Sequence, residues 1–489
     1  MKLSHLGLIL IMFPMILSAN IINVPEDFES IQAGIDNAEN RDTVLVQPGT
    51  YNEQISFNDK SVVVGSLFIT TGDETYISQT IIDAEGEGRP VTFDYEEPRR
   101  PTLSGFTLTN GSTENGGGIY CSDYSPILNH LIITGNFAEA DGGGMFCSRQ
   151  TVPTLSNVTI VNNTAEGQGG GIYCRDSSGP RITNSSIVGN SAASGGGIYC
   201  NTSASPTLID VVVSRNTSLS LGGGIACTAN SIVRMTRVLI ADNTAEQHSG
   251  GGIYMSASEL ELTNVTLSRN STNGEGGGIF IIGVSILEIT NSVLWGNNNH
   301  QVHSHGGPNP PAEITISYCD IDEGQDSIYI QGNANLEWLE GNINEDPLFV
   351  NISNYHLTQD SPCIDAGDPN SREDPDYTRA DMGAFYFDPD YGIPEISNNP
   401  FPSEFEIIGN YPNPFNSTTT IIYQLPEMGQ VTLSVYDLNG KLITTLFNNE
   451  QSIGIHQVIW NALDIPSGEY LYQLKAGSVL RTSKLILVK

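Results

Sequence analysis

The chain has 489 residues, of which 55 are acidic and 20 are basic, so its formal net charge is −35. This length leaves room for two to four domains of ordinary size. Binding to DNA or RNA depends on clustered lysine and arginine side chains, so the acidic composition excludes nucleic acid as a partner, whereas calcium and neutral glycans are compatible with it.

The N-terminus has the pattern of a secretory signal peptide. Lys2 precedes an apolar run from Leu6 to Leu17, and small residues end the segment at Ala19. The run has 12 residues, which is too short for a membrane-spanning helix and typical of a signal-peptide core. We therefore expect residues 1–19 to be removed on export, and no transmembrane segment to remain afterwards.

A repeat of 26–28 residues occupies the middle of the chain. Its marker is a glycine triplet that begins at residues 116, 142, 169, 195, 222, 250 and 276. Each repeat has about three short β-rich runs separated by Gly, Asn and Ser turns, and it has no helical periodicity. The sequence therefore predicts an all-β fold, in which parallel strands wind into a three-sided coil and successive turns stack about 4.8 Å apart.

In such a coil, equivalent residues of successive repeats form vertical columns. Strand alternation places the aliphatic and cysteine columns on one face, so we expect both to point inward and the cysteines to form an apolar ladder of thiols. The asparagines are predicted to form an inward ladder of side-chain amides, and the glycines to form a corner. The aliphatic column is Ile119, Met145, Ile172, Ile198, Ile225, Ile253 and Ile279; the cysteine column is Cys121, Cys147, Cys174, Cys200, Cys227, Met255 and Ile281; the asparagine column is Asn110, Asn136, Asn163, Asn190, Asn216, Asn243, Asn270 and Asn297.

An aromatic column lies between the aliphatic and cysteine columns and is expected to face outward. At intervals of about 4.8 Å, such rings can form a platform on which sugar rings stack. The other interpretation is that they stack on one another and cover the glycine corner. The column consists of Tyr120, Phe146, Tyr173, Tyr199, Tyr254 and Phe280.

Two further columns carry charge and are the candidate places for catalysis. One contains Asp210 and Arg237, and the other contains Arg215, Asp242 and Arg269. A basic residue beside carboxylates is the arrangement that abstracts a proton from an acidic sugar. The alternative is an exposed ladder of ion pairs, which contributes little to stability.

The repeat resembles the right-handed parallel β-helix repeats of the pectin-lyase-like superfamily and of polymorphic outer-membrane proteins. The glycine triplets and the Asn-Thr-Ala motif at residues 163–165 carry this resemblance. Residues 24–57 are similar to the usual entry into this fold, which implies that a helix around Ile31–Ala38 caps the open end of the core. Residues 343–385 resemble the closing segment of secreted β-helix proteins. The aspartate sets of pectin esterases and polygalacturonases are absent from the repeats.

The last 84 residues are similar to the C-terminal sorting domain of the type IX secretion system, which is a small β-sandwich. The motifs that carry this resemblance are at residues 411–416, 435–441, 466–470 and 484–489. It implies the type IX secretion machinery as a partner, and a location outside a Gram-negative cell or attached to its surface. The predicted organisation is thus a signal peptide (1–19), a right-handed β-helix (20–387, with regular coils at about 100–300), a linker (388–405) and a sorting domain (406–489).

Metal ligands and disulfides have weaker signals. The acidic run Asp320, Asp322, Glu323 and Asp326 is a candidate for structural calcium, which prefers several oxygens from one loop. A second acidic run contains Asp365, Asp368, Asp374, Asp376 and Asp381. Apart from calcium, no cofactor is expected. Cys319 and Cys363 are the candidate disulfide. The irregular segment 295–313 contains His300, His303 and His305, which form either a metal site or part of a mobile polar loop.

Together these features predict a secreted or surface-attached β-helix that binds glycans or proteins without catalysis, as an adhesin does. The alternative is a polysaccharide lyase or a related carbohydrate-active enzyme that uses a face of the same coil. A groove lined by several carboxylates and a base would favour the enzyme. The regular repeats from 110 to 297 favour the binding module.

Overall fold

The computed structural model describes residues 19–94, 100–307, 310–351, 354–387 and 405–487, apart from short gaps at 412–414, 416–417, 426–428, 438–440, 452–453, 464 and 478. The chain divides into two compact units: Met1–Pro347 with Ser361–Tyr386, and Leu348–Asp360 with Phe387–Lys489. Nearly all of the predicted signal peptide and linker, and parts of the motifs at 411–416, 435–441 and 484–489, lie outside the described residues.

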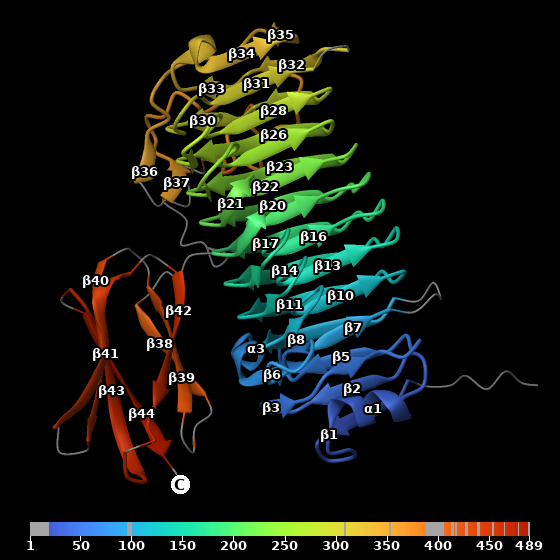
Figure 1. Cartoon of the computed structure of the whole chain (residues 1–489), viewed down its shortest axis with the longest axis vertical. Coiled ribbons are helices and arrows are strands. Elements are labelled where there is room, and N and C mark those ends of the chain that lie inside the picture. Colours follow the sequence, from blue (N-terminus) through green and yellow to red (C-terminus); the bar gives the residue numbers. More distant parts are fainter. Residues whose placement is uncertain are drawn as a thin grey trace, which may run out of the picture. The chain divides into compact units, whose positions relative to one another are not determined.

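The first unit is a coil of stacked parallel strands (Figure 1). Its largest sheet has 17 strands, here called sheet A. These strands are β1 (Ile21–Val24), β2 (Thr43–Val46), β3 (Gly49–Asn52), β5 (Val63–Ser66), β6 (Thr80–Asp83), β8 (Thr102–Thr109), β11 (Ile127–Thr134), β14 (Thr154–Val161), β17 (Arg181–Val188), β20 (Thr207–Ser214), β23 (Ile232–Ala241), β26 (Glu259–Ser268), β29 (Ile286–Thr290), β30 (Val293–Trp295), β32 (Ala312–Ser317), β33 (Asp320–Ile321) and β35 (Ala334–Trp338).

Two smaller sheets form the other sides of the coil. Sheet B has 11 strands: β4 (Ile55–Ser56), β7 (Val91–Phe93), β10 (Ile119–Ser122), β13 (Met145–Ser148), β16 (Ile172–Cys174), β19 (Ile198–Cys200), β22 (Ile225–Thr228), β25 (Ile253–Ser256), β28 (Ile279–Gly283), β31 (Val302–Gly306) and β34 (Ile328–Gly332). Sheet C has seven: β9 (Ser112–Thr113), β12 (Phe137–Ala138), β15 (Thr164–Ala165), β18 (Ser191–Ser194), β21 (Thr217–Leu221), β24 (Thr244–Ala245) and β27 (Ser271–Thr272). The order of sheet B along the coil follows the chain order, so successive turns stack directly.

Sheet A bends within its long strands, at one residue in each. In β14, for example, Asn157 has φ 54° and is left out of the register between β11 and β14. The same left-handed conformation recurs at Asn184, Asp210, Arg237 and Asn264. A single residue of positive φ therefore divides each long strand into two segments that lie on different sides of the core.

The core is a continuous aliphatic column closed by a helix at its N-terminal end. The predicted inward residues, such as Ile172 and Ile198, are 0–1% exposed. Helix α1 (Ile31–Asn37) buries Ile31 and Ile35, so the predicted cap is confirmed. The Ser30 hydroxyl accepts a hydrogen bond from the amide of Ala33 and thereby caps the helix. The short helices α2 (Phe68–Thr71), α3 (Thr75–Gln79) and η1 (Gly324–Ser327) lie in connections.

Each glycine of a triplet is required for its own reason. The first has positive φ, as in Gly142 at 73°. A Cβ on the second, Gly143, would stand 2.5 Å from the carbonyl oxygen of Gly170. A Cβ on the third, Gly144, would stand 2.6 Å from the carbonyl oxygen of Gly171. Real Cβ atoms do not approach oxygen so closely, and the predicted glycine corner is confirmed.

The asparagine ladder is confirmed from Asn136 to Asn297. The Oδ1 atom of Asn190 accepts hydrogen bonds from both the amide and the Nδ2 of Asn163, at 2.9 and 3.0 Å. The Nδ2 atom of Asn190 donates to Asn216 Oδ1 and to the carbonyl of Ile160. Every hydrogen-bonding position of the buried amide is therefore used.

Asn110 was wrongly predicted to belong to this ladder. It is exposed, has φ 55°, and donates to the Asp83 carboxylate. Gly111 occupies the ladder position instead, and its backbone amide donates to Asn136 Oδ1. Asn110 is thus at the outward corner that follows the strand, one residue before the ladder.

The cysteine ladder is also confirmed, because Cys121, Cys147, Cys174, Cys200 and Cys227 pair in register and, like the other two cysteines, are free and buried. The pKa of the Cys147 thiol is raised well above its usual value, first by its contacts with the thiols of Cys121 and Cys174 and then by burial. Cys319 and Cys363, the candidate disulfide, are not bonded to each other. Burial raises the pKa of Cys319 to about 12, and the Cys363 thiol donates to Asp320.

The second unit contains two antiparallel sheets. One has β38 (Glu406–Tyr411), β39 (Thr418–Leu425) and β42 (Gly454–Asn461), and the other has β41 (Leu442–Gln451), β40 (Gly429–Asp437), β43 (Gly468–Ala476) and β44 (Val479–Leu487). One core joins them, with Tyr423 and Trp460 from the first sheet and Tyr472 and Leu485 from the second. The predicted small β-sandwich is therefore confirmed. The same unit includes the hairpin β36 (Phe349–Asn351) and β37 (Asn354–Leu357).

We predict that Asn190→Ala lowers the free energy of unfolding of the coil by about 3–5 kcal/mol, because it removes four side-chain hydrogen bonds and leaves buried polar groups unpaired. Urea unfolding followed by circular dichroism measures the change. The control is Asn184→Gly, which alters an exposed corner residue with φ 47° in the same coil. A loss as small as that of the control would contradict the structural role of the ladder.

We also predict that none of the seven cysteines reacts with a thiol reagent in the native protein, because each is buried. In denaturant without reductant, all seven are expected to react. Titration with a chromogenic disulfide reagent counts them. Five or fewer reactive thiols in denaturant would show that a disulfide is present in the exported protein.

Candidate functional site

The aromatic column faces outward, but its rings are covered. The centroids of Tyr120 and Phe146 are 5.3 Å apart with an interplanar angle of 3°, and those of Phe146 and Tyr173 are also 5.3 Å apart. Phe146, Tyr173 and Tyr199 are only 3–6% exposed. The geometry therefore favours mutual stacking over an open platform for sugar rings.

The aromatic column is interrupted by an alanine and later continues with a histidine. Ala226 replaces the aromatic residue in β22, between Tyr199 and Tyr254. Beyond Phe280, the register of β28 with β31 places His303 in the column, and Tyr329 of β34 follows. The imidazole of His303 therefore occupies a position where the other coils have a ring that packs against its neighbours.

The charged columns are located at corners of the coil. Asp210, Arg237, Asp242 and Arg269 all have φ between 52° and 57°, as does Arg215 at 54°. Arg237 Nε and Nη2 donate to the two carboxylate oxygens of Asp210, at 2.6 and 2.8 Å. Arg269 Nε donates to Asp242 at 2.9 Å. Asp210 with Arg237, and Asp242 with Arg269, thus form vertical ion pairs on partly exposed corners.

The three aspartates predicted to bind calcium have separate environments. Asp320 is fully buried, and its pKa is raised to about 6 by burial; its carboxylate accepts from the amide of Glu345. Asp322 accepts from the amide of Gly296. Asp326 is exposed on η1. The Asp320 carboxylate therefore ties the last coils together through the amide of Glu345 and the thiol of Cys363.

The second acidic run organises the segment 361–386, here called the closing segment. The carboxylate of Asp381 accepts from the amide of Asp365, and that of Asp374 accepts from the amide of Asp381, both at 2.7 Å. The closing segment packs on sheet A, where Asn264 Nδ2 donates to the carbonyl of Asp381 and Asn291 Oδ1 accepts from the amide of Asp368. These carboxylates hold the turns of the segment.

The irregular segment 295–313 contains a strand of the β-helix. Residues 302–306 form β31, which pairs with β28 and β34, so the prediction of a mobile loop is wrong for these residues. Asn299 has φ 50°, and its carbonyl oxygen accepts a hydrogen bond from the amide of Gly276, the first glycine of the preceding triplet. Asparagine therefore supplies the corner conformation here, and the coil lacks its glycine marker.

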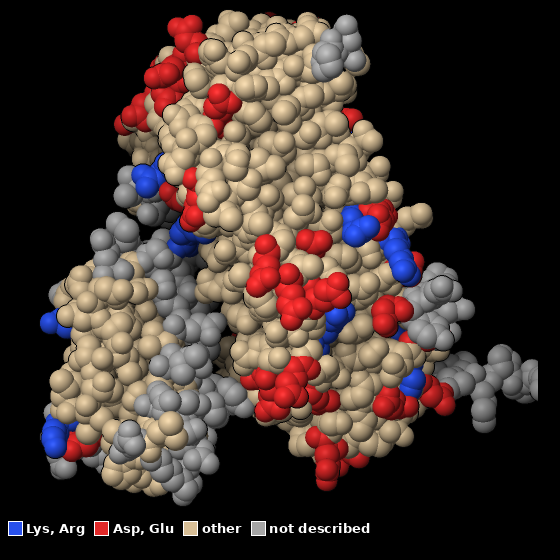
Figure 2. Space-filling view, in the orientation of Figure 1, with Lys and Arg blue, Asp and Glu red and all other residues tan. Residues whose placement is uncertain are grey.

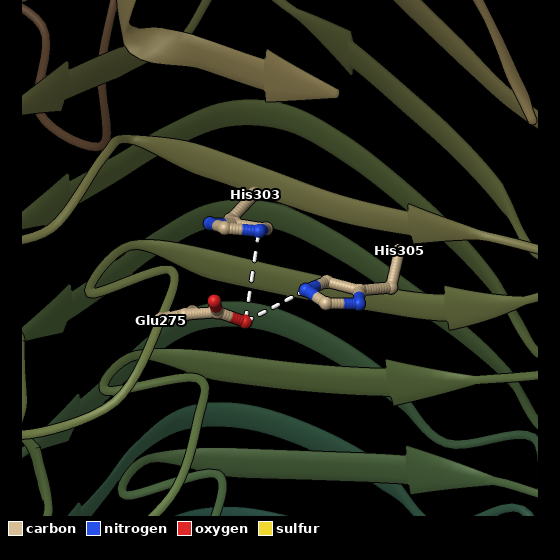
Figure 3. Close-up of side chains that lie close together, drawn as sticks. All are labelled: Glu275, His303 and His305. Carbon is tan, nitrogen blue, oxygen red and sulfur yellow. Dashed lines mark hydrogen bonds and ion pairs between the residues drawn. The ribbon is translucent and has the colours of Figure 1, made fainter. Parts of the chain in front are cut away.

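Two histidines on β31 converge on one glutamate from the coil below (Figure 3). His305 Nε2 is 2.7 Å from Glu275 Oε2, and His303 Nε2 is 3.6 Å from the same oxygen. Among the residues that the structure describes, these are the only three His, Cys, Asp or Glu side chains whose ligand atoms all lie within 4.8 Å of one another.

The two histidines differ in environment. The side chain of His303 is 4% exposed, whereas those of His305 and Glu275 are 34% and 47% exposed. Burial lowers the pKa of His303, and the nearby imidazoles of His305 and His300 lower it further, although Glu275 acts in the opposite direction. Both ring nitrogens of His303 are buried without a hydrogen-bond partner.

His300, the third histidine of the predicted site, is exposed and has φ 77°. Its ring lies 5.0 Å from that of Tyr329 and 5.4 Å from that of His303. Glu275 was missed by sequence reasoning. It immediately precedes a glycine triplet, and only the pairing of β28 with β31 brings it to the histidines.

Sequence reasoning also missed an apolar surface at the turn between β28 and β29, here called the aliphatic edge. It consists of Ile282, Val284 and Ile286, which are 37%, 42% and 41% exposed. The corresponding positions of Ile282 in the two preceding coils are Thr228 and Ser256. Over the face drawn in Figure 2, acidic side chains form several patches and basic side chains are few.

Two family models match the chain. Residues 95–271 match the model described as a right handed beta helix region, and residues 410–489 match the model described as a secretion system C-terminal sorting domain. No curated protein matches the sequence closely enough to count as a relative. No helix among the described residues is long and apolar enough to cross a membrane.

One solved structure that matches is the enzymatically active domain of tailspike protein 2 from bacteriophage CBA120. The two chains are 11% identical, the match covers 96% of this chain and 76% of the phage chain, and the TM-score is 0.29. At this level the match carries no argument about function. The fold and the two family matches lead to one conclusion: the chain is a right-handed parallel β-helix protein with a C-terminal sorting domain, and this domain implies export across the outer membrane by the type IX secretion system.

Proposed function

We propose that the exported β-helix is a non-catalytic binding module of the adhesin type, displayed on the cell surface or released, and that it binds a partner protein through the aliphatic edge. The observation that carries this proposal is the exposure of Ile282, Val284 and Ile286 at one turn. Three partly exposed aliphatic side chains at alternate positions of one turn offer a partner an apolar surface, whose burial contributes about 25 cal/mol per Å².

Carboxylates surround this apolar surface. Ile286 lies between Glu259 of β26 and Glu313 of β32 in the register of sheet A, and Glu288 is two residues further along β29. Glu288 and Glu313 are exposed. An apolar centre with an acidic rim fits a partner protein that presents apolar side chains flanked by lysine or arginine. Such charges increase the association rate and fix orientation more than they increase affinity.

The covered aromatic column supports a protein over a glycan as the partner. Stacking of a sugar requires an open ring face, and the faces of Phe146, Tyr173 and Tyr199 are turned toward one another. The paired corner charges support binding over catalysis. Arg237 and Arg269 each donate to an aspartate of the neighbouring coil, which holds their guanidinium groups away from the role of a base.

We predict that replacing Ile282, Val284 and Ile286 together by serine weakens binding at least tenfold, because about 1 kcal/mol or more is lost per buried aliphatic group. The purified mature chain is labelled and added to intact cells of the producing strain from which its gene has been deleted, and retention is measured. Retention should fall with increasing salt and should be abolished when the cells are treated with protease but not with periodate.

The matched control replaces Val152 and Leu219 by serine, which are exposed aliphatic residues on other coils. This control should bind as the wild type does. Equal retention of both variants would contradict the assignment to the aliphatic edge. Sensitivity to periodate alone would show a glycan partner, and release of unsaturated oligosaccharides from a uronic-acid polymer would establish the polysaccharide lyase instead.

A further inference from the structure

We propose that Glu275, His303 and His305 form a binding site for a zinc-class transition-metal ion on the outer face of sheet B. This inference is independent of the proposed function. It concerns two neighbouring coils: the histidines come from alternate positions of β31, and the glutamate comes from the turn before β28.

The backbone fixes the directions of the two histidines. Val302 and Ser304 of β31 are fully buried, so His303 and His305 project together from the opposite face of the strand. In-register pairing with β28 places this strand directly above the end of the turn that carries Glu275. Sites built on sheet strands hold their ligands more firmly than sites built on loops.

The distances suit one ion with only small side-chain rotations. Two ligand atoms bonded to a tetrahedral zinc ion at about 2.0–2.2 Å lie about 3.3–3.6 Å apart. The Nε2 atoms of His305 and His303 lie 2.7 and 3.6 Å from Glu275 Oε2, and all three ligand atoms lie within 4.8 Å of one another. A metal ion would replace the proton that His305 Nε2 now shares with the carboxylate.

A second observation also indicates a ligand. Both ring nitrogens of His303 are buried without a hydrogen-bond partner, which destabilises the folded chain unless a ligand satisfies them. The ring packs 5.6 Å from Phe280, 5.0 Å from His305 and 4.8 Å from Tyr329, so it is held in place among its neighbours. A metal bond at Nε2 would satisfy the nitrogen that faces Glu275.

The donor set determines the class of ion. Two imidazole nitrogens and one carboxylate oxygen suit zinc and neighbouring transition metals, whereas calcium and magnesium prefer oxygen ligands alone. Three protein ligands leave a fourth position for water or another ligand. His305 and Glu275 are partly exposed, so this position is accessible to solvent.

The test uses the mature chain, produced without a polyhistidine tag and stripped of metal with a chelator. Zinc chloride is then titrated in competition with a chromogenic chelator. We expect one zinc ion per chain and no displacement by calcium. Because each ligand contributes one of three bonds, Glu275→Gln and His305→Ala should each weaken zinc binding at least tenfold, and both replace partly exposed side chains that the fold tolerates.

The matched control is His300→Ala. Its ring lies near His303 but does not belong to the three-residue group, so zinc affinity should not change. Zinc should also raise the melting temperature of the wild type and of this control, but not that of His305→Ala, because only a native site stabilises the folded state. Cobalt, used as a spectroscopic probe, should give tetrahedral absorption bands that Glu275→Gln removes.

Three results would overturn the proposal. The first is the absence of zinc binding by the wild type. The second is unchanged affinity in both Glu275→Gln and His305→Ala, which would mean that zinc binds elsewhere on the chain. The third is loss of binding in the His300 control, which would place the site on different residues.

Discussion

The whole β-helix depends on the exact superposition of one coil on the next, and the buried asparagine ladder is the interaction that enforces it. Each amide is both donor and acceptor to its neighbours, so a coil shifted by one residue would bury several unpaired polar groups. Aliphatic side chains supply most of the driving force for folding, but they tolerate sliding. The asparagine ladder does not tolerate sliding, and it therefore fixes the register between successive coils of the apolar core.

This dependence explains why so much of the fold could be predicted from the sequence. Residues that are one repeat apart in the sequence are neighbours in the coil. The residue types in one column therefore show whether that position is buried, exposed or at a corner. The cysteines of β10 to β22, the glycine corner and the asparagine ladder were therefore predicted from their spacing alone. The two family matches agree with the division into a β-helix and a sorting domain, while the predicted domain boundaries stay predictions.

The errors and omissions occur where the spacing of residues does not determine the backbone conformation or the pairing of strands. Spacing does not show which residues have positive φ, because aspartate and arginine at the corners can adopt the same conformation as asparagine and glycine there. The spacing therefore placed Asp210 and Arg237 in one charged column but did not show that they lie at a bend. The coil containing β31 has no glycine triplet, so its spacing could not show that His303 continues the aromatic column or that Glu275 lies beneath His305.

The free thiols have a consequence for how an exported protein reaches its native state. Many secreted proteins need oxidation and reshuffling of their cysteines before they become stable, so their folding depends on the redox conditions of the compartment. Here the sulfur atoms of the five cysteines in the column are packing groups, equivalent in place to the Met255 and Ile281 that follow them. Folding of the coil therefore requires no disulfide formation. The same covalent structure serves on either side of the outer membrane, and the native state does not depend on the redox conditions there.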